Sequence, residues 1–369
     1  MTAVGRTAVA PTRGLLKRNL DRIDGADRVA GVDLARGLAV VGMLAAHLLI
    51  VPILVLGDPS TWAGVVDGRS SILFATLAGV SLGLATGGRR RRTGDALRVA
   101  RLRLLVRAAV LWILGIALIL TGVPVYVILP AYALLFVLAV PFLRLGAPVL
   151  LVVAAASAVI LPFVQPILDE QPVWSGRAGE TLSFAIGWHY PFTVWIAFVL
   201  AGLGIARAGV DRLRVQLWMV GAGAALAAVG YGADAALGTP ADAYAAQVWT
   251  AAPHSSGVLE VIGSGGFAIA VTGLCLLLCR TGLRVVVLPL RATGAMPLTA
   301  YTAQLVVWAV WAASVLGDAG DLSGFRALDP FPVITLATIA GCTAWALLIG
   351  RGPLEWVLDR VARLVPSRG

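Results

Sequence analysis

Three side chains in the stretch 31–50, GVDLARGLAVVGMLAAHLLI, could do chemistry together: Asp33, Arg36 and His47. In an α-helix, the steps from Arg36 to His47 rotate the chain by about 1100°, roughly three full turns, and rise ~16 Å. Asp33 precedes Arg36 by about one turn. The spacing therefore predicts that a carboxylate, a guanidinium and an imidazole share one face of a single helix.

Imidazole can accept and return a proton near neutral pH, and a guanidinium stays charged and binds phosphate oxygens in pairs. The two groups would suit an extended carrier such as a coenzyme A thioester. Its phosphates would lie near Arg36 and its reactive end near His47, which would act as a general base. A histidine hydrogen-bonded between packed helices is the alternative, but ionisable groups inside a membrane are costly and are commonly functional.

The composition indicates which elements hold these groups. The chain has 369 residues, of which 59% are hydrophobic and 13% charged, and its mean hydropathy is +0.90. These values lie far outside the usual range of soluble proteins. The sequence therefore predicts an all-α polytopic membrane bundle with about ten spans. The predicted segments are 37–57, 70–88, 104–122, 124–143, 147–166, 188–206, 215–237, 258–279, 293–317 and 331–350.

The basic residues predict the orientation. With alternating spans and a cytoplasmic N-terminus, 26 of the 29 Lys and Arg residues fall on one side, leaving Arg69, Arg177 and Arg326 on the other. This is the positive-inside pattern of a plasma-membrane protein with both termini in the cytoplasm. The net charge of +10 is then explained by contact with anionic lipid or a cytosolic anion, and no nucleic acid is expected. We predict a cytosolic basic tail over 1–30, a transmembrane domain over 31–350 and a cytosolic amphipathic segment over 351–369.

Further polar side chains are expected at the outer side. Arg69 begins the second span, His189 the sixth, and His254 precedes the eighth. Tyr301 and Gln304 enter the ninth span, where polar groups need partners inside the bundle. Each histidine alone is explained by contact with water, and Arg69 by reaching to the membrane surface. Their spacing is not that of a zinc site, so no metal is predicted.

Several stretches resemble a known family. Arg36, ten further residues and His47 resemble the R-x10-H motif of the acyltransferase-3 type of membrane acyltransferase. The wider pattern is similar to the YeiB-like branch of that transmembrane superfamily, which also includes heparan-alpha-glucosaminide N-acetyltransferase. The stretches that carry it are GVDLARGLAVVGMLAAH, GRSSILFATLAGVSL, WHYPFTVWIAFVLAGLGIAR, PHSSGVLEVIGSGG, GAMPLTAYTAQ and GPLEW.

The resemblance implies a helical bundle that moves an acyl group from cytosolic acyl-CoA, acetyl-CoA in the first instance, to an acceptor at or beyond the membrane. By position, His47 would be the base, Arg36 would support the phosphate end of the donor, and Asp33 stands where the family tends to place an acid. We add Arg69 as a second donor-binding candidate.

On the acceptor side we place Arg69, His189, His254, Tyr301 and Gln304. The loop DPSTWAGVVDG lacks the histidine that the lysosomal enzyme carries there, so heparan specificity is not implied.

Three functions stay open from the sequence. The first is an O- or N-acyltransferase that acts on a hydroxyl or amine of a cell-envelope sugar or lipid. The second is a non-enzymatic transporter or flippase for an amphiphilic envelope precursor. The third is a scaffold that kept the fold and lost the chemistry. The expected partners are the lipid bilayer, acyl-CoA and an unidentified acceptor, and a homodimer is compatible with all three functions.

Overall fold

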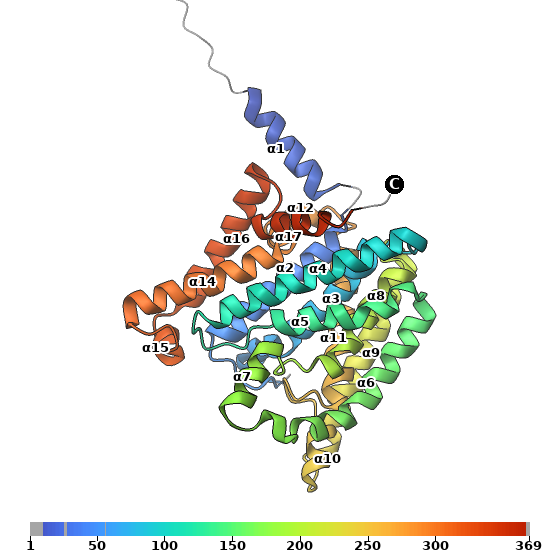
Figure 1. Cartoon of the computed structure of the whole chain (residues 1–369), viewed down its shortest axis with the longest axis vertical. Coiled ribbons are helices and arrows are strands. Elements are labelled where there is room, and N and C mark those ends of the chain that lie inside the picture. Colours follow the sequence, from blue (N-terminus) through green and yellow to red (C-terminus); the bar gives the residue numbers. More distant parts are fainter. Residues whose placement is uncertain (1–9, 26–27, 56, 367–369) are drawn as a thin grey trace, which may run out of the picture.

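A computed structural model of the chain describes residues 10–25, 28–55 and 57–366. These residues form helices joined by loops, without a strand (Figure 1). The longer apolar helices are α2 (Ala30–Leu48), α3 (Arg69–Ala85), α4 (Gly94–Ile119), α5 (Leu129–Ala139), α6 (Ala147–Asp169), α8 (Phe192–Ala208), α9 (Leu213–Leu237), α11 (Val258–Leu278), α14 (Pro297–Leu316) and α16 (Pro330–Leu348).

Shorter or more polar helices connect and flank these ten. They are α1 (Ala10–Ile23), η1 (Pro59–Val66), η2 (Val140–Arg144), η3 (Pro172–Trp174), α7 (Gly176–Ile186), α10 (Ala243–Val248), α12 (Leu283–Val286), α13 (Leu288–Ala295), α15 (Leu322–Ala327) and α17 (Pro353–Arg363).

The all-α polytopic bundle predicted from the sequence is confirmed. Within the described ranges, eight helical segments are long and apolar enough to cross a membrane, one of them formed by η1 and α3 together. The segments Leu129–Arg144 and Phe192–Ala208 are apolar but shorter. Each of the ten predicted segments thus corresponds to an apolar helix. Their orientation in a membrane stays a prediction.

The first predicted span, 37–57, is misplaced by about two turns. Helix α2 begins at Ala30, with Asp33 in its first turn, and ends at Leu48. Leu49 is extended, and Pro52 follows shortly after, which prevents the helix from continuing. His47 therefore lies in the last turn of α2 and not at mid-span.

Helix α2 is the centre of the bundle and packs against α3, α11, α13, α14 and α16 (Figure 1). Two glycines allow neighbouring helices to approach each other closely. A Cβ atom on Gly42 would lie 2.2 Å from the Ser70 hydroxyl oxygen of α3, and one on Gly79 would lie 2.0 Å from the Val199 carbonyl oxygen of α8. Helix α2 is thus packed closely on the Ser70 side chain of α3, and α3 is packed on the backbone of α8.

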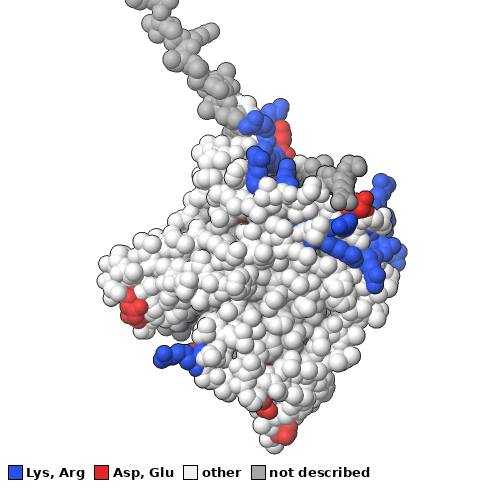
Figure 2. All heavy atoms as spheres, viewed as in Figure 1, with Lys and Arg blue, Asp and Glu red and all other residues white. Residues whose placement is uncertain are grey.

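Basic side chains gather at one end of the molecule. Figure 2 shows them at the top of the view, where Figure 1 places α1, α17 and one end of α4. The lower part of the same face shows few charges. This distribution agrees with the positive-inside pattern read from the sequence.

Helix α17 closes this basic end. The Glu355 carboxylate accepts the backbone N–H groups of Leu298 (2.8 Å) and Thr299 (3.1 Å), which are free donors in the first turn of α14. The helix expected within 351–369 is therefore present, and its contact with a membrane surface stays a prediction. In the expected tail 1–30, α1 is helical, and residues 1–9 lie outside the described part.

Candidate active site

A cavity of about 420 Å³ lies where α2 ends. All three histidines of the chain line it, although 207 positions separate the first from the last. The lining comes from α2, the segment from the end of η1 to the start of α3, the loop before α5, the loop between α7 and α8, the loop before α11, and α15. The polar lining residues are His47, Asp67, Ser70, Ser71, Tyr126, His189, Tyr190, His254 and Arg326.

His47 is held through its backbone. Its carbonyl oxygen accepts hydrogen bonds from Nε (3.1 Å) and Nη2 (2.8 Å) of Arg326. This carbonyl lies in the last turn of α2, where carbonyl groups lack partners within the helix. The imidazole itself forms no hydrogen bond with another residue of the described ranges, and it lines the cavity. The ring is therefore free to bind a proton or a substrate.

His254 stands in a strained turn that a buried carboxylate organises. His254 and Ser256 have φ angles of 63° and 55°, which non-glycine residues rarely adopt. The Glu260 carboxylate accepts both of their backbone N–H groups, at 2.6 and 2.7 Å. Glu260 therefore fixes the loop that carries the His254 ring into the cavity.

The His254 ring also pairs with Asp67. Its Nε2 lies 3.4 Å from Asp67 Oδ1. Burial disfavours the charged imidazole, but the hydrogen bond to Asp67 and the charges of Glu260 and Asp67 outweigh this effect and raise the pKa of His254. The pair thus favours the protonated form of His254 at the cavity wall.

His189 has a different environment. Its ring stacks on Tyr126 with ring centroids 3.6 Å apart, and burial lowers the pKa of His189. The neighbouring Tyr190 donates a hydrogen bond to the Tyr126 carbonyl oxygen (3.1 Å) and contacts the His254 ring edge to face. These aromatic rings form a flat wall of the kind that packs against sugar rings or other planar groups.

Arg36 and Asp33 lie at the other end of α2. Asp33 accepts hydrogen bonds from Arg36 and from Arg28, both at 2.8 Å, and Arg36 also donates to the Ser81 hydroxyl of α3 (2.6 Å). Neither Arg36 nor Asp33 lines the histidine cavity. The residues expected to bind the acyl donor are thus separated from His47 by the ~16 Å rise of α2 between Arg36 and His47.

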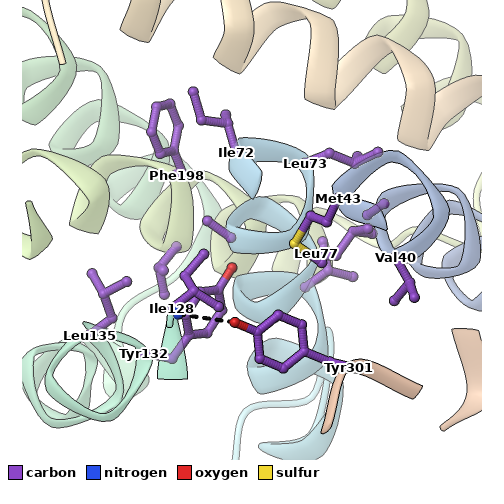
Figure 3. Packing of buried hydrophobic residues seen from close by; sticks show 14 of the residues in the cluster. Val40, Met43, Ile72, Leu73, Leu77, Ile128, Tyr132, Leu135, Phe198 and Tyr301 are labelled. Carbon is purple, nitrogen blue, oxygen red and sulfur yellow. Dashed lines mark hydrogen bonds between the residues drawn. The ribbon is translucent and has the colours of Figure 1, made fainter. Parts of the chain in front are cut away.

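Apolar side chains fill the space between these two groups. Val40 and Met43 of α2 pack against Leu73 and Leu77 of α3 (Figure 3), and each is at most 4% exposed. Met43 also lines the histidine cavity, so this layer is its floor. A chain that passes from Arg36 to His47 would have to displace these four side chains.

Arg69 lies in the wall of a second cavity. Its Nε donates to the Tyr231 hydroxyl (2.7 Å), its Nη1 donates to the Gly64 carbonyl oxygen (3.1 Å), and its guanidinium covers the Tyr231 ring. The second cavity measures about 1000 Å³, is mostly apolar, and shares Asp67 with the histidine cavity. Arg69 therefore lies beside the histidine site and contacts protein groups of two other elements, η1 and α9.

Tyr301 and Gln304 lie inside the bundle. The Tyr301 hydroxyl accepts the Ile128 N–H at 3.3 Å (Figure 3). Gln304 is buried, and its amide has no hydrogen-bond partner in the part of the chain that the structure describes. Neither residue lines the histidine cavity, and their part in acceptor binding stays a prediction.

Four further residues of the site were not predicted from the sequence: Asp67, Tyr126, Tyr190 and Arg326. Two features of the sequence indicated that Arg326 and Tyr126 could lie at the site. Arg326 is one of the few basic residues expected outside, and Pro124 beside Tyr126 interrupts the fourth apolar segment. The structure leaves 123–128 outside helices, and this broken stretch supplies Tyr126 to the cavity.

No group of three or more His, Cys, Asp or Glu side chains suited to a metal ion occurs among the described residues. The side chains of the cavity offer an imidazole without a hydrogen bond, an imidazole paired with a carboxylate, hydroxyl groups and a guanidinium. Such a set can move protons and stabilise negative charge at a reacting carbonyl.

Comparison with known families gives two matches. A family model described as heparan-alpha-glucosaminide N-acetyltransferase, catalytic, matches residues 28–232. A model described as a protein of unknown function, DUF418, matches residues 211–364. Comparison with individually curated proteins gives no match. The first model covers more than half of the chain and includes His47, Asp67 and His189, whereas His254 and Arg326 fall in the second.

Proposed function

Because the chain belongs to the family of the heparan-alpha-glucosaminide N-acetyltransferase catalytic domain, we propose that it is a membrane acyltransferase. It takes an acyl group, acetyl in the first instance, from cytosolic acyl-CoA and transfers it to a hydroxyl or amine of a cell-envelope sugar or lipid. The observation that carries this proposal is the meeting of three histidines and Arg326 in one cavity at the far end of α2 from Arg36.

The donor approaches from the basic end. We place this end in the cytoplasm of a plasma-membrane protein, where acyl-CoA is available. Arg36 and Ser81, which already touch each other, lie at the entrance between α2 and α3. The acyl arm then passes between these helices through the layer that Val40, Met43 and Leu77 now fill, and it delivers the thioester to the histidine cavity.

His47 acts as the general base. Its free imidazole accepts the proton of the acceptor hydroxyl or amine while the acceptor oxygen or nitrogen bonds to the thioester carbonyl carbon. The carbon–sulfur bond breaks next, and the leaving coenzyme A sulfur takes up the proton from His47. The base is thereby regenerated, and no net charge is left in the cavity.

Arg326 and the pair of His254 with Asp67 support this transfer. The Arg326 guanidinium is anchored on the His47 carbonyl group, so its positive charge stays beside the reacting carbon and stabilises the oxyanion. The His254 ring, with its raised pKa, and the stacked His189 and Tyr126 rings orient the acceptor. Asp33 keeps Arg36 and Arg28 in place through two charge-assisted hydrogen bonds.

The test uses radiolabelled acetyl-CoA with the purified full chain and an envelope extract. We expect label to move onto an extractable acceptor and free coenzyme A to appear in equal amount. We also expect acetyl-CoA to raise the melting temperature, and Arg36→Ala to reduce that rise. The absence of both transfer and stabilisation with every acyl-CoA tried would overturn the proposal.

One observation favours a second function, the non-enzymatic transport of an amphiphile. The second, mostly apolar cavity of about 1000 Å³ adjoins the histidine cavity and is large enough for part of a lipid. A transporter should be stabilised by the envelope precursor alone and should tolerate His47→Gln. An enzyme should respond to acyl-CoA and lose transfer on that substitution.

A further inference from the structure

A third cavity, of about 350 Å³, lies at the basic end, and four of its ten lining residues are arginines. Helix α4 and the loop before it contribute Arg92, Arg103 and Arg107, and α17 contributes Arg363. The end of α3 forms the remaining wall. The Asp359 carboxylate of α17 is the one acidic side chain of this lining.

We call this third cavity the arginine pocket. Its positive charges exceed the single negative charge of the Asp359 carboxylate. Asp359 accepts hydrogen bonds from Arg351 (2.9 Å) and, more weakly, from Arg107 (3.4 Å), and it pairs with Arg363 at 2.7 Å. Four lining arginines face this one carboxylate, so an excess of three positive charges remains around the cavity.

Buried donors in the pocket are also left without partners. The Nε atoms of Arg103 and Arg107 are buried and form no hydrogen bond within the described residues. The Nη2 of Arg103 reaches only the Val365 carbonyl oxygen, at 3.4 Å. Buried donors without partners are costly, and a bound anion with several oxygens would satisfy them.

The arginine pocket lies close to the proposed donor path along α3. Ser81, the partner of Arg36, precedes the pocket residue Ala85 by four positions on α3, which places the two on one face about 6 Å apart along the axis. Two of the N–H groups of Arg36 are already bonded to Asp33 and Ser81. The anionic end of a donor would find further cationic donors, without partners of their own, in the arginine pocket one turn along α3 from Ser81.

We infer that the arginine pocket of α4 and α17 binds the phosphate groups of the acyl donor, namely the adenosine 3′-phosphate 5′-diphosphate end of coenzyme A. Arg36 then lies along the pantetheine arm between this pocket and His47. The inference rests on the proposed function, because it assumes a coenzyme A donor. Anionic lipid head groups carry the same phosphate chemistry and are the competing source.

The experiment measures binding to the full chain, purified in a neutral detergent without added lipid. The probes are coenzyme A, dephospho-coenzyme A, pantetheine and phosphatidylglycerol. We expect the affinity to fall in the order coenzyme A, dephospho-coenzyme A, pantetheine. We expect the double variant with Arg103→Gln and Arg107→Gln to bind coenzyme A at least tenfold more weakly. Its affinity for pantetheine should be unchanged.

Arg98→Gln is the matched control, because Arg98 is an exposed arginine of the same helix outside the pocket. Arg92→Gln, in the loop before α4, is a second test variant that removes no helical residue. Melting temperatures without ligand check that each variant is folded. Equal coenzyme A affinity in the pocket variants and in Arg98→Gln would overturn the inference, and so would stabilisation by phosphatidylglycerol but not by coenzyme A.

A short donor that lacks phosphates, S-acetyl-N-acetylcysteamine, separates this inference from the proposed function. We expect the pocket variants to transfer acetyl from it at the wild-type rate. Transfer from it together with unchanged coenzyme A affinity in the variants would refute the pocket alone. Pocket-dependent coenzyme A binding without acyl transfer from either donor would refute the proposed enzyme and keep the pocket as a coenzyme A site.

Discussion

Arg326 Nη2 lies 2.8 Å from the carbonyl oxygen of His47, although 279 residues separate them in the chain. This contact joins α15 to the end of α2 and links the two halves of the chain that different family models match. It brings a guanidinium to an imidazole without consuming the imidazole nitrogens. The contact therefore serves both the stability of the helix end and the proposed reaction.

Replacing Arg326 tests both roles. Arg326→Ala removes two charge-assisted hydrogen bonds, and we expect it to lower the free energy of unfolding by about 1–3 kcal/mol. We expect it to slow acetyl transfer by roughly 10²-fold, because the oxyanion loses its nearest positive charge. Arg177→Ala, an exposed arginine outside the cavity, is the control and should change neither quantity.

The pair of His254 and Asp67 predicts a pH dependence of stability. The raised pKa of His254 means that the folded protein binds the proton of this imidazole more tightly than the unfolded chain does. The stabilisation is complete below about pH 6.5, the usual histidine value, and is lost as the pH rises through the raised pKa. The pKa of His189 is lowered, so His189 destabilises the folded protein at pH values below its usual pKa.

Asp67→Asn should therefore flatten the decrease of melting temperature as the pH rises above about 6.5. The two side chains are 41% and 42% exposed, so salt should weaken the effect. Asp95→Asn, an exposed carboxylate of α4, is the control. The same slope in Asp67→Asn as in the wild type would show that this pair does not cause it.

Gly79 tests the close packing that holds α3 against α8. Gly79→Ala would place a Cβ atom 2.0 Å from the Val199 carbonyl oxygen, so the helices must separate. We expect a loss of about 1–3 kcal/mol in unfolding free energy. Gly221→Ala in α9 is the control, because no atom lies within 4 Å of its added Cβ, and alanine favours a helix. Equal melting temperatures of the two variants would contradict this packing.

The orientation in the membrane is testable by cysteine labelling in intact cells. Arg90 lies in the loop between α3 and α4, and Arg177 lies in α7; both are exposed. We expect an impermeant thiol reagent to label Arg177→Cys from outside and Arg90→Cys only after lysis. The wild type, whose Cys275 and Cys342 are buried, gives the background. Labelling of both variants from the same side would contradict the positive-inside assignment.

Much of the fold could be predicted because the length of an apolar run determines whether it can span a membrane. The ten segments follow from this rule. The end of α2 did not follow, because Val51, Ile53 and Leu54 are as apolar as the helix before them. Only the extended backbone at Leu49 and the proline at 52 stop the helix.

The histidines of the candidate site could be predicted from the sequence, but the residues that contact them could not. An imidazole among apolar residues stands out in any sequence, whereas Asp67 and Arg326 lie in ordinary polar stretches. What joins them to His254 and His47 is the packing of loops that are distant in sequence. Arg36 shows the reverse: its charge is visible in the sequence, but its hydrogen bonds with Asp33 and Ser81 depend on the fold.

The most direct test of the account compares donor binding with acyl transfer in His47→Gln. The variant should keep the rise in melting temperature that acetyl-CoA gives the wild type, because His47 lies at the far end of α2 from Arg36 and outside the arginine pocket. Its rate of acetyl transfer should fall by roughly 10²- to 10⁴-fold, because the base is lost. Transfer at the wild-type rate in a folded His47→Gln protein would contradict the central claim.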